Sequence, residues 1–454
     1  MKRWSKQAAG SNSRTQNIRV SICLYNIRRK GKYRDSYPPS GGLAIIFWPS
    51  GMANIYISHM GGSMKKYTIL AVFLFCSITQ AQWAPQTQNG PNDNDHSQAS
   101  WVQKGASQAW FDIAMSGDGK YQTATVDSGH LWVSTDFGNT WVQKAALQYW
   151  FFIEMSGDGK YQTAVSGGDP AAADDFGSLW VSKDYGNTWT QKTSSQYWSY
   201  LAMSRDGRYQ TSIADYIYVS TDYGETWTPK ASAQSWTYIA MSSDGRTQTA
   251  PAYGDYLYIS TDYGNTWMQK ASAQNWTYTA MSGDGRIQTT ATDDGYLWVS
   301  TDCGNTWVQK ATQQSWAYIA MSSSGKYQTA TVYDTNYMFV STDYGHTWIQ
   351  KATPQNWEGV MISNDGSVQT ALADNGYICV SKNYGDSWTQ QATSQIWSWV
   401  AMSSNGKIQT AVAYYGYMWE YGLGTDSKAV KTNHKGRLLQ QKWKHAKMKE
   451  ATRK

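Results

Sequence analysis

The sequence predicts an all-β protein, an eight-bladed β-propeller with four-stranded antiparallel blades. Three observations predict it: a tryptophan that starts a short apolar run about every 40 residues, a turn segment written seven times, and chain ends that complement each other. Aromatic residues make up 15%, with 25 Trp and 33 Tyr against only 9 Pro, which favours strands. The eight tryptophans are Trp110, Trp150, Trp198, Trp236, Trp276, Trp316, Trp357 and Trp397.

Each repeat is expected to contain four strands. In one clear copy these are residues 236–242, 246–250, 256–260 and 266–270, with a Ser-Asp-Gly turn between the first two. The third run alternates apolar and polar residues, as a half-buried strand does. We therefore expect each repeat to form one blade.

The turn between the third and fourth strands reads Ser-Thr-Asp-Tyr-Gly-Asn-Thr-Trp at residues 260–267. The Asp262 carboxylate can accept backbone N–H groups in an Asx-turn, Gly264 supplies a positive φ, and the Thr266 hydroxyl can bond locally. Trp267 then covers the hairpin with a large apolar surface.

This turn resembles the Asp-box, or BNR repeat, of sialidase-type β-propellers, a family that includes sialidases, xyloglucan hydrolases, sortilin-type receptors and photosystem II assembly factors. The resemblance implies a scaffold role for the box. The seventh copy departs from the pattern by replacing Asp with Asn, which can form the same turn. The seven box residues are Asp136, Asp184, Asp222, Asp262, Asp302, Asp343 and Asn383.

The two ends of the repeat region predict how the ring closes. The last repeat stops after its third strand, near Tyr421, whereas residues 100–104 match a fourth strand at residues 140–144. An N-terminal strand that completes the last blade leaves no open sheet edge. We therefore expect a propeller at 100–421 with eight blades; seven blades plus a stray unit is the alternative.

The segments outside the repeats have other characters. Residues 64–81 have two lysines, a short apolar core and small residues at a cleavage position, which is typical of a signal peptide and too short for a transmembrane helix. Residues 1–63 are basic and are interpreted as a mis-assigned upstream extension, with a transit peptide as the alternative. Residues 82–99 are a linker and 422–454 a basic tail. We expect a secreted or periplasmic protein, or alternatively one in an organelle lumen.

The formal net charge of +6 belongs to the ends of the chain. The repeat body has an excess of acidic residues, so we expect no nucleic-acid partner. The basic tail is a candidate for contact with an anionic surface.

Variation between repeats concentrates in the loops between the second and third strands, which favours that face for ligand binding. These loops carry Asp127, Asp215, Asp255, Asp293, Asp334 and Asp374. Carboxylates beside aromatic rings suit sugars, because hydroxyls need acceptors and C–H faces stack on rings. The ligand-binding candidates are therefore these six aspartates with Trp110, Trp236, Trp276 and Trp316; a turn-forming role for the aspartates and blade packing for the tryptophans are the alternatives.

Three acids break the repeat pattern in the first strand of their blades: Asp112, Glu154 and Glu358. Asp112 and Glu154 lie in adjacent blades and are candidates for the paired carboxylates of a glycosidase. The arginine triad and the Phe/Tyr-Arg-Ile-Pro motif of sialidases do not appear, so the resemblance does not imply sialidase activity.

These features favour a secreted, non-enzymatic module that binds a glycan or another cell-surface ligand. A glycoside hydrolase is the alternative, and an assembly factor for a membrane complex is a third. We expect no cofactor other than a possible calcium ion, and the acidic face favours a neutral or calcium-bridged sugar.

Overall fold

A computed structural model describes residues 43–47, 53–57, 65–69, 100–167, 177–193, 196–333, 337–351 and 355–422. The chain divides into two compact units, Met1–Pro91 and Asn92–Lys454. All regular elements of the described residues are strands. The all-β prediction is therefore confirmed.

The first unit contains one antiparallel sheet with the order β1-β2-β3. Its strands are β1 (Leu43–Phe47), β2 (Ala53–Ile57) and β3 (Lys65–Ile69). Strand β3 lies inside the segment 64–81. The signal peptide stays a prediction, because most of that segment lies outside the described residues.

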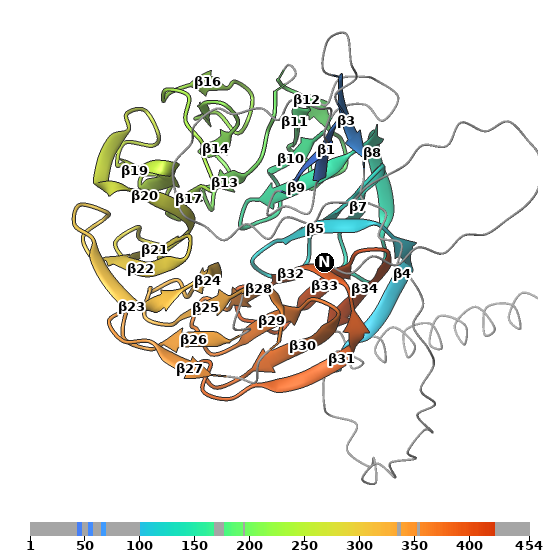
Figure 1. Cartoon of the computed structure of the whole chain (residues 1–454). Helices are drawn as coiled ribbons and strands as arrows, with labels where there is room; N and C mark the ends of the chain where they lie inside the picture. The colour runs from blue at the N-terminus through green and yellow to red at the C-terminus, as the bar shows by residue number, and fades with distance from the viewer. Residues whose placement is uncertain are drawn as a thin grey trace, which may run out of the picture. The chain divides into compact units, whose positions relative to one another are not determined.

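The second unit is a ring of eight four-stranded antiparallel blades (Figure 1). Blade 1 contains β5 (Trp110–Met115), β6 (Gln122–Val126), β7 (Gly129–Ser134) and β8 (Val142–Gln148). Blade 2 contains β9 (Trp150–Met155), β10 (Gln162–Ser166), β11 (Ser178–Ser182) and β12 (Thr190–Gln191). Blade 3 contains β13 (Leu201–Met203), β14 (Gln210–Ile213), β15 (Ile217–Ser220) and β16 (Thr228–Pro229).

Blades 4 and 5 share one long strand, so they form a single seven-stranded sheet. Blade 4 contains β17 (Ala240–Met241), β18 (Gln248–Pro251), β19 (Tyr253–Ser260) and the first half of β20 (Met268–Met281). Blade 5 contains the second half of β20, then β21 (Gln288–Thr292), β22 (Gly295–Ser300) and β23 (Val308–Gln314). Blade 6 contains β24 (Trp316–Met321), β25 (Gln328–Val332), β26 (Met338–Ser341) and β27 (Ile349–Lys351).

Blade 7 contains β28 (Trp357–Ile362), β29 (Gln369–Ala373), β30 (Gly376–Ser381) and β31 (Thr389–Gln395). Blade 8 contains β32 (Trp397–Met402), β33 (Gln409–Ala413) and β34 (Gly416–Tyr421). Its fourth strand is β4 (Val102–Gln108), which pairs antiparallel with β34. The eight-blade prediction and closure by an N-terminal strand are therefore confirmed.

A ring of buried side-chain hydrogen bonds runs through all eight blades. In every second strand a buried Gln is followed by a Thr, and the Thr hydroxyl donates to the Gln carbonyl of the next blade; between blades 1 and 2, for example, Thr123 Oγ1 lies 2.6 Å from Gln162 Oε1. The ring closes where Thr410 of blade 8 donates to Gln122 of blade 1, also at 2.6 Å. Each Gln amide also donates to the carbonyl of a turn glycine, as Gln122 does to Gly119. The remaining Thr-to-Gln bonds are Thr163 to Gln210, Thr211 to Gln248, Thr249 to Gln288, Thr289 to Gln328, Thr329 to Gln369 and Thr370 to Gln409.

A second ring is made of backbone. The first residue of each turn between the first two strands donates its N–H to the same turn of the next blade, as Gly117 does to the carbonyl of Gly157. This ring also closes from blade 8 to blade 1, with Ser404 N 2.8 Å from Gly117 O. Because backbone bonds need no particular side chain, this ring tolerates the variation at these positions.

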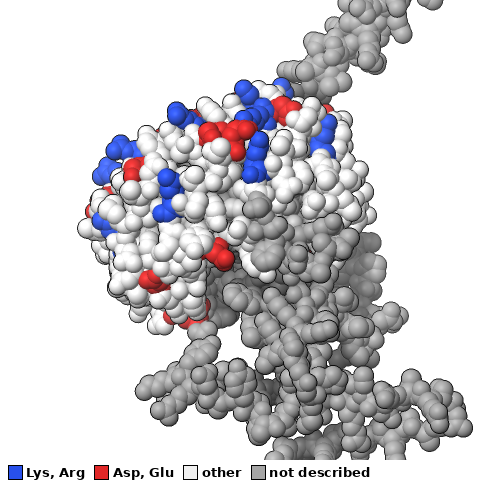
Figure 2. All heavy atoms as spheres, turned by 90° about the horizontal axis from the view of Figure 1, so that it is seen from above, with Lys and Arg blue, Asp and Glu red and all other residues white. Residues whose placement is uncertain are grey.

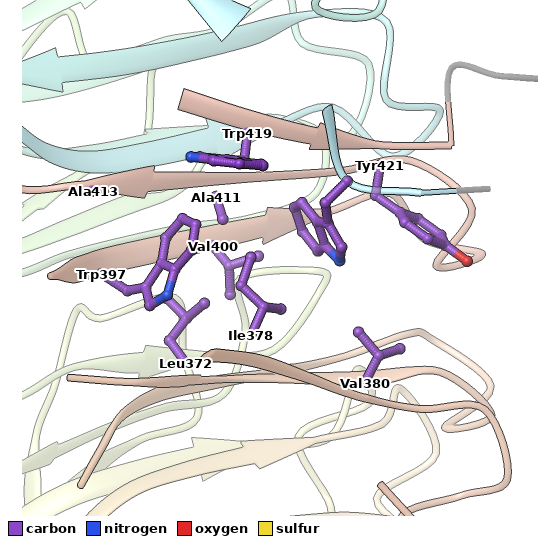
Figure 3. Packing of buried hydrophobic residues seen from close by; sticks show 10 residues of the cluster. Leu372, Ile378, Val380, Trp397, Val400, Ala411, Ala413, Trp419 and Tyr421 are labelled. Carbon is purple, nitrogen blue, oxygen red and sulfur yellow. The ribbon is translucent and has the colours of Figure 1, made fainter. Parts of the chain in front are cut away.

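The hydrophobic core lies between neighbouring blades. Figure 3 shows the layer between blades 7 and 8, in which Trp397 and Val400 of β32 face Leu372 of β29 and Ile378 of β30. Trp101, just before β4, joins this layer, with its ring centroid 5.6 Å from that of Tyr421. The closing strand is therefore anchored by an aromatic side chain as well as by its backbone.

The Asp-box turns have the predicted structure. Asp262 accepts hydrogen bonds from the Thr266 N–H at 2.9 Å, the Thr266 hydroxyl at 2.7 Å and the Ser260 hydroxyl at 2.8 Å. Gly264 has a φ of 81°, and the Trp267 indole donates to its carbonyl at 3.0 Å. Burial opposes ionisation of Asp262, but these hydrogen bonds outweigh it and lower its pKa. Asn383 replaces Asp with the same acceptor geometry, since its Oδ1 lies 3.0 Å from the Ser387 N–H.

Candidate functional site

The loops between the second and third strands are mostly tight turns that hold their aspartates in fixed positions. Asp127 and Asp293 are each followed by a residue with positive φ, Ser128 at 56° and Asp294 at 47°. The Asp127 N–H also bonds the carbonyl of Ala109, at the start of the same blade. The turn-forming interpretation of these aspartates is therefore correct for the backbone, and their carboxylates remain available for contacts.

Two of these carboxylates accept hydrogen bonds from tyrosines of the preceding blade. The Tyr253 hydroxyl of blade 4 lies 3.0 Å from Asp293 Oδ2 of blade 5, and the Tyr414 hydroxyl of blade 8 lies 3.3 Å from Asp127 Oδ2 of blade 1. Such pairs fix the orientation of both side chains across a blade boundary.

The other predicted aspartates differ in their surroundings. Asp255 accepts from the Tyr258 hydroxyl at 3.0 Å, and Asp374 from the Asn356 amide at 3.2 Å. Asp215 is exposed, and Asp334 lies outside the described residues. The structure thus places five of the six on one side of the ring, in the same class of loop.

The prediction that first-strand tryptophans stack on a ligand is wrong for three of the four. Trp110, Trp276 and Trp316 are exposed by 1%, 0% and 3%, because they pack between blades. The Trp316 indole donates to the carbonyl of Gly295 in the preceding blade at 3.0 Å. Only Trp236 is half-buried. The packing interpretation therefore holds, since a buried ring offers no face to a ligand.

Exposed tyrosines take the place of the tryptophans on this side of the molecule, which the sequence reasoning missed. They lie in or directly after the loops of blades 3, 4, 6, 7 and 8, where recurring Tyr beside the turn was the available signal. They are Tyr216, Tyr253, Tyr256, Tyr333, Tyr377, Tyr415 and Tyr417. Together with Asp127, Asp215, Asp255, Asp293, Asp374 and Tyr414 we call them the tyrosine–aspartate face.

Positive charge is segregated away from this face. Within residues 100–422, every Lys and Arg lies in the turn between the first two strands, in an Asp-box or in a fourth strand. Fourth-strand lysines reach the Asp-box of the next blade, as Lys144 does with Asn187 at 2.7 Å. Figure 2 shows one side of the ring, where Lys and Arg lie over the upper part. Toward the lower rim, the charged residues in this view are acidic. The tyrosine–aspartate face is therefore acidic and uncompensated.

Asp112, one of the three unusual acids, is a structural brace between blades 1 and 2. Its side chain is buried, with one carboxylate oxygen 2.7 Å from the Ile113 N–H and the other 3.0 Å from the Ile153 N–H. Burial raises the pKa of Asp112 to about 7, although these two hydrogen bonds oppose the rise. Both oxygens already serve the backbone.

Glu154 of blade 2 differs from Asp112 in being exposed to solvent at the centre of the ring. The surrounding protein and the negative charge of Asp112 raise its pKa to about 8. The charge of Asp112 therefore acts on Glu154, and the paired-carboxylate role of the two acids stays a prediction. Glu358 of blade 7 is half-buried, and burial with the charge of Asp374 raises its pKa to about 7.

Aromatic rings line the centre of the propeller beside these acids. Their centroids lie 4.7 Å apart for Phe152 and Tyr200, and 4.8 Å for Tyr200 and Tyr238. The series continues from Tyr238 through Tyr278 to Tyr318, with centroid distances of 5.1 and 4.8 Å. This series occupies the position at which Asp112 stands in blade 1.

Blade 7 interrupts the series with a glycine. A Cβ at Gly359 would lie 3.0 Å from the Trp399 ring, so glycine leaves the space that Trp399 of blade 8 fills. Trp399 thereby reaches Tyr318 of blade 6, at a centroid distance of 5.8 Å. The aromatic lining spans the gap at blade 7 because this glycine has no side chain.

Metal-binding clusters and membrane-spanning helices are considered for the described residues alone. Among them, no group of three or more His, Cys, Asp or Glu side chains is arranged to hold a metal ion. The expected calcium ion stays a prediction. The same residues include no helix that is both long and apolar enough to span a bilayer.

Comparisons with known proteins agree with this architecture. Residues 131–144 and 179–192 match the model of the BNR-Asp box repeat. The protein is a β-propeller with BNR/Asp-box repeats. No curated protein matches the sequence.

Solved structures show the fold only. The C-terminal WD40 domain of Sif2 is similar with a TM-score of 0.56 and 9% identity, covering 71% of this chain and 98% of that domain. The GH74 xyloglucanase of Xanthomonas campestris has a TM-score of 0.49 and 14% identity; 65% of this chain is covered, but the match spans only 56% of the xyloglucanase. YCF48 of Cyanidioschyzon merolae has a TM-score of 0.45 and 13% identity, and the match covers 71% of this chain and 98% of YCF48.

Proposed function

We propose that the protein is a non-enzymatic binding propeller that recognises a glycan through its tyrosine–aspartate face. One observation carries the proposal: exposed tyrosine rings alternate with carboxylates on a face without Lys or Arg. Sugar C–H faces stack on aromatic rings, while sugar hydroxyls need acceptors such as carboxylates. The placement of residues 64–81 ahead of the propeller supports the further proposal that the protein is secreted.

The geometry of the face favours a ligand that forms several polar contacts. Tyr253 with Asp293, and Tyr414 with Asp127, present a hydroxyl and a carboxylate side by side in orientations fixed by their mutual hydrogen bond. Such preorganised groups lose little conformational entropy on binding. Neighbouring blades repeat this chemistry, so an oligosaccharide can contact several of them.

A glycoside hydrolase remains a second candidate because of Glu154. This side chain is accessible, and its pKa of about 8 suits a general acid near neutral pH. Its predicted partner is poorly suited, since both carboxylate oxygens of Asp112 are held by backbone N–H groups. The carboxylate pair therefore lacks a second free member.

A glycan array probed with the full chain tests the proposal when binding and cleavage are both scored. We expect binding without cleavage. The double change Asp215→Asn with Asp293→Asn should weaken binding at least several-fold, whereas Glu154→Gln should leave it unchanged. In a hydrolase, Glu154→Gln would instead lower turnover by about 10²–10⁴-fold. Cleavage that depends on Glu154, or an array without any bound glycan, would contradict the proposal.

A further inference from the structure

We propose that the glycan recognised by the tyrosine–aspartate face carries free amino groups, and that Glu358 and Asp374 hold one of its ammonium groups at the centre of this face. The inference rests on the proposed function and refines it. The ligand class becomes a cationic amino sugar, in place of the neutral or calcium-bridged sugar that the sequence favoured.

Glu358 occupies an unusual position in the repeat. It follows the buried Trp357 in β28, at a position where the other blades have no acid; blades 3 and 6, for example, have Ser199 and Ala317. The side chain is half-buried, and no described residue donates a hydrogen bond to its carboxylate. A partly buried carboxylate without a donor is costly unless a ligand supplies one.

A second carboxylate of like charge lies beside Glu358. The Asp374 N–H bonds the carbonyl of Asn356 at 2.6 Å and Ala373 pairs with Trp357, so the loop that carries Asp374 starts beside Glu358. The charge of Asp374 adds to the burial that raises the pKa of Glu358 to about 7. Within the described residues, no Lys or Arg occurs in the loops on this side of the ring, so none of their cations compensates the pair. A ligand ammonium group between the two carboxylates would interact favourably with both.

Tyrosines of the neighbouring blade add aromatic rings to these two carboxylates. Tyr333 stands where four other blades have aspartate, and this residue is 38% exposed. Tyr333 and Tyr318 belong to blade 6, whose first strand β24 packs against β28 of blade 7. Burial and the charge of Glu358 raise the pKa of Tyr333, and the same charge contributes to the rise at Tyr318. The faces of tyrosine rings attract cations. The centre of the face therefore combines carboxylates with aromatic rings, which together select an organic cation over a metal ion.

The remainder of the face favours a sugar over a basic peptide. Around the centre, the pairs Tyr253–Asp293 and Tyr414–Asp127 offer hydroxyls and carboxylates together, as sugar hydroxyls require. A lysine-rich segment would satisfy the charge, but it would not supply the hydroxyl groups that these pairs can bind. The amino sugar satisfies both.

Two oligosaccharides that differ in N-acetylation, and therefore in charge, test the proposal: the hexamer of glucosamine and the hexamer of N-acetylglucosamine. Their affinities for the full chain are measured by calorimetry at pH 7, where both the Glu358 carboxyl and the ligand amines are partly charged, in low salt and with EDTA. We expect the glucosamine hexamer to bind at least tenfold more tightly, and its affinity to fall as salt is added. Glu358→Gln should weaken its binding about five- to tenfold and leave the N-acetylated hexamer unchanged.

Asp386→Asn is the matched control, because it removes one negative charge from an Asp-box position where other blades have Asn. It should leave both affinities unchanged, and Glu358→Ser, which copies blade 3, should behave like Glu358→Gln. Equal binding of the two hexamers, or binding of neither, would overturn the inference, whereas the proposed function is contradicted only by the glycan array. Binding lost in EDTA, or oligolysine bound more tightly than the glucosamine hexamer, would also overturn the inference.

Discussion

The junction between blades 3 and 4 and the junction between blades 8 and 1 contain the same parts, but blade 3 is one continuous segment, whereas blade 8 joins β32–β34 to β4 from the other end of the propeller. Thr211 donates to Gln248 at the first junction and Thr410 to Gln122 at the second, each at 2.6 Å. Both also have an apolar core layer between the blades. The chain enters blade 1 from β4, and β4 is held in blade 8 by its antiparallel pairing with β34 and by the packing of Trp101.

One buried acid distinguishes the closing junction. Blade 3 places Val219 under the glycine of the next Asp-box, whereas blade 8 places Glu420 there. The Trp141 indole donates to Glu420 Oε1 at 3.0 Å, and Lys104 Nζ of β4 lies 3.7 Å from Glu420 Oε2. This carboxylate therefore links β34, β4 and the first Asp-box. Non-covalent closure therefore uses a specific polar contact where the other junctions use apolar packing.

The largest effect is expected from deleting residues 97–104 in the full chain. The deletion removes the first residues of β4, Lys104 and the buried Trp101, and loss of one buried Trp alone costs about 3–5 kcal/mol. Because all blades share the two hydrogen-bond rings, the whole propeller should lose stability in one cooperative transition. Calorimetry measures it, with deletion of residues 446–454 as the control. An unchanged melting temperature would mean that β4 does not close the ring.

The second prediction concerns a glycine at an ordinary junction. Gly264→Val forces a β-branched residue to positive φ, and its Cβ would lie 2.9 Å from Val219 of the preceding blade. Strain and overpacking together should cost about 2–4 kcal/mol in chemical denaturation.

Gly105 in β4 provides the matched control for this change. It has a similar φ of 64° but nothing within 4 Å of an added Cβ, so Gly105→Val should cost only the backbone strain, about 1–3 kcal/mol. Equal losses for the two variants would show that contact between blades adds nothing at Gly264.

The third prediction uses pH. Burial raises the pKa of Glu420 to about 7, so the folded state binds its proton more tightly than the unfolded chain does. The resulting stability is present at acidic pH and is lost as pH rises through about 7. Glu420→Val, which copies blade 3, should stabilise the protein by roughly 1–3 kcal/mol at pH 8 and by less at pH 5.5.

The reciprocal change Val219→Glu tests the same comparison at the ordinary junction. It buries a carboxylate where Lys230 takes the place of Lys104 but Trp267 already donates its indole N–H to Gly264, and it should cost about 3–5 kcal/mol at pH 8. A Glu420→Val variant less stable than the wild type at pH 8 would show that the polar contact outweighs its desolvation.

The smallest effect is expected from the hydrogen-bond ring. Thr410→Val and Thr211→Val each leave a buried Gln carbonyl without its Thr donor, at a cost of about 1–3 kcal/mol in denaturant titrations. Because the two bonds have the same length and burial, the losses should be equal. A larger loss at Thr410 would identify the closing junction as the weaker one.

Local repetition allowed the sequence alone to predict most of the fold. Asp262, Gly264 and Thr266 form their turn with each other, so seven copies predict seven such turns wherever they lie in space. The blade count and the closing strand follow from the same period, because each repeat has one first-strand tryptophan. The class of loop that holds the aspartates was predictable for the same reason.

Contacts between blades were decided only by the tertiary structure. A tryptophan that starts a strand has the same sequence context whether its ring is buried or exposed, and only the neighbouring blade buried Trp276. Asp112 is likewise a brace because the Ile153 N–H of the next blade reaches it. Burial and charge proximity depend on packing across repeats, which a local pattern does not contain.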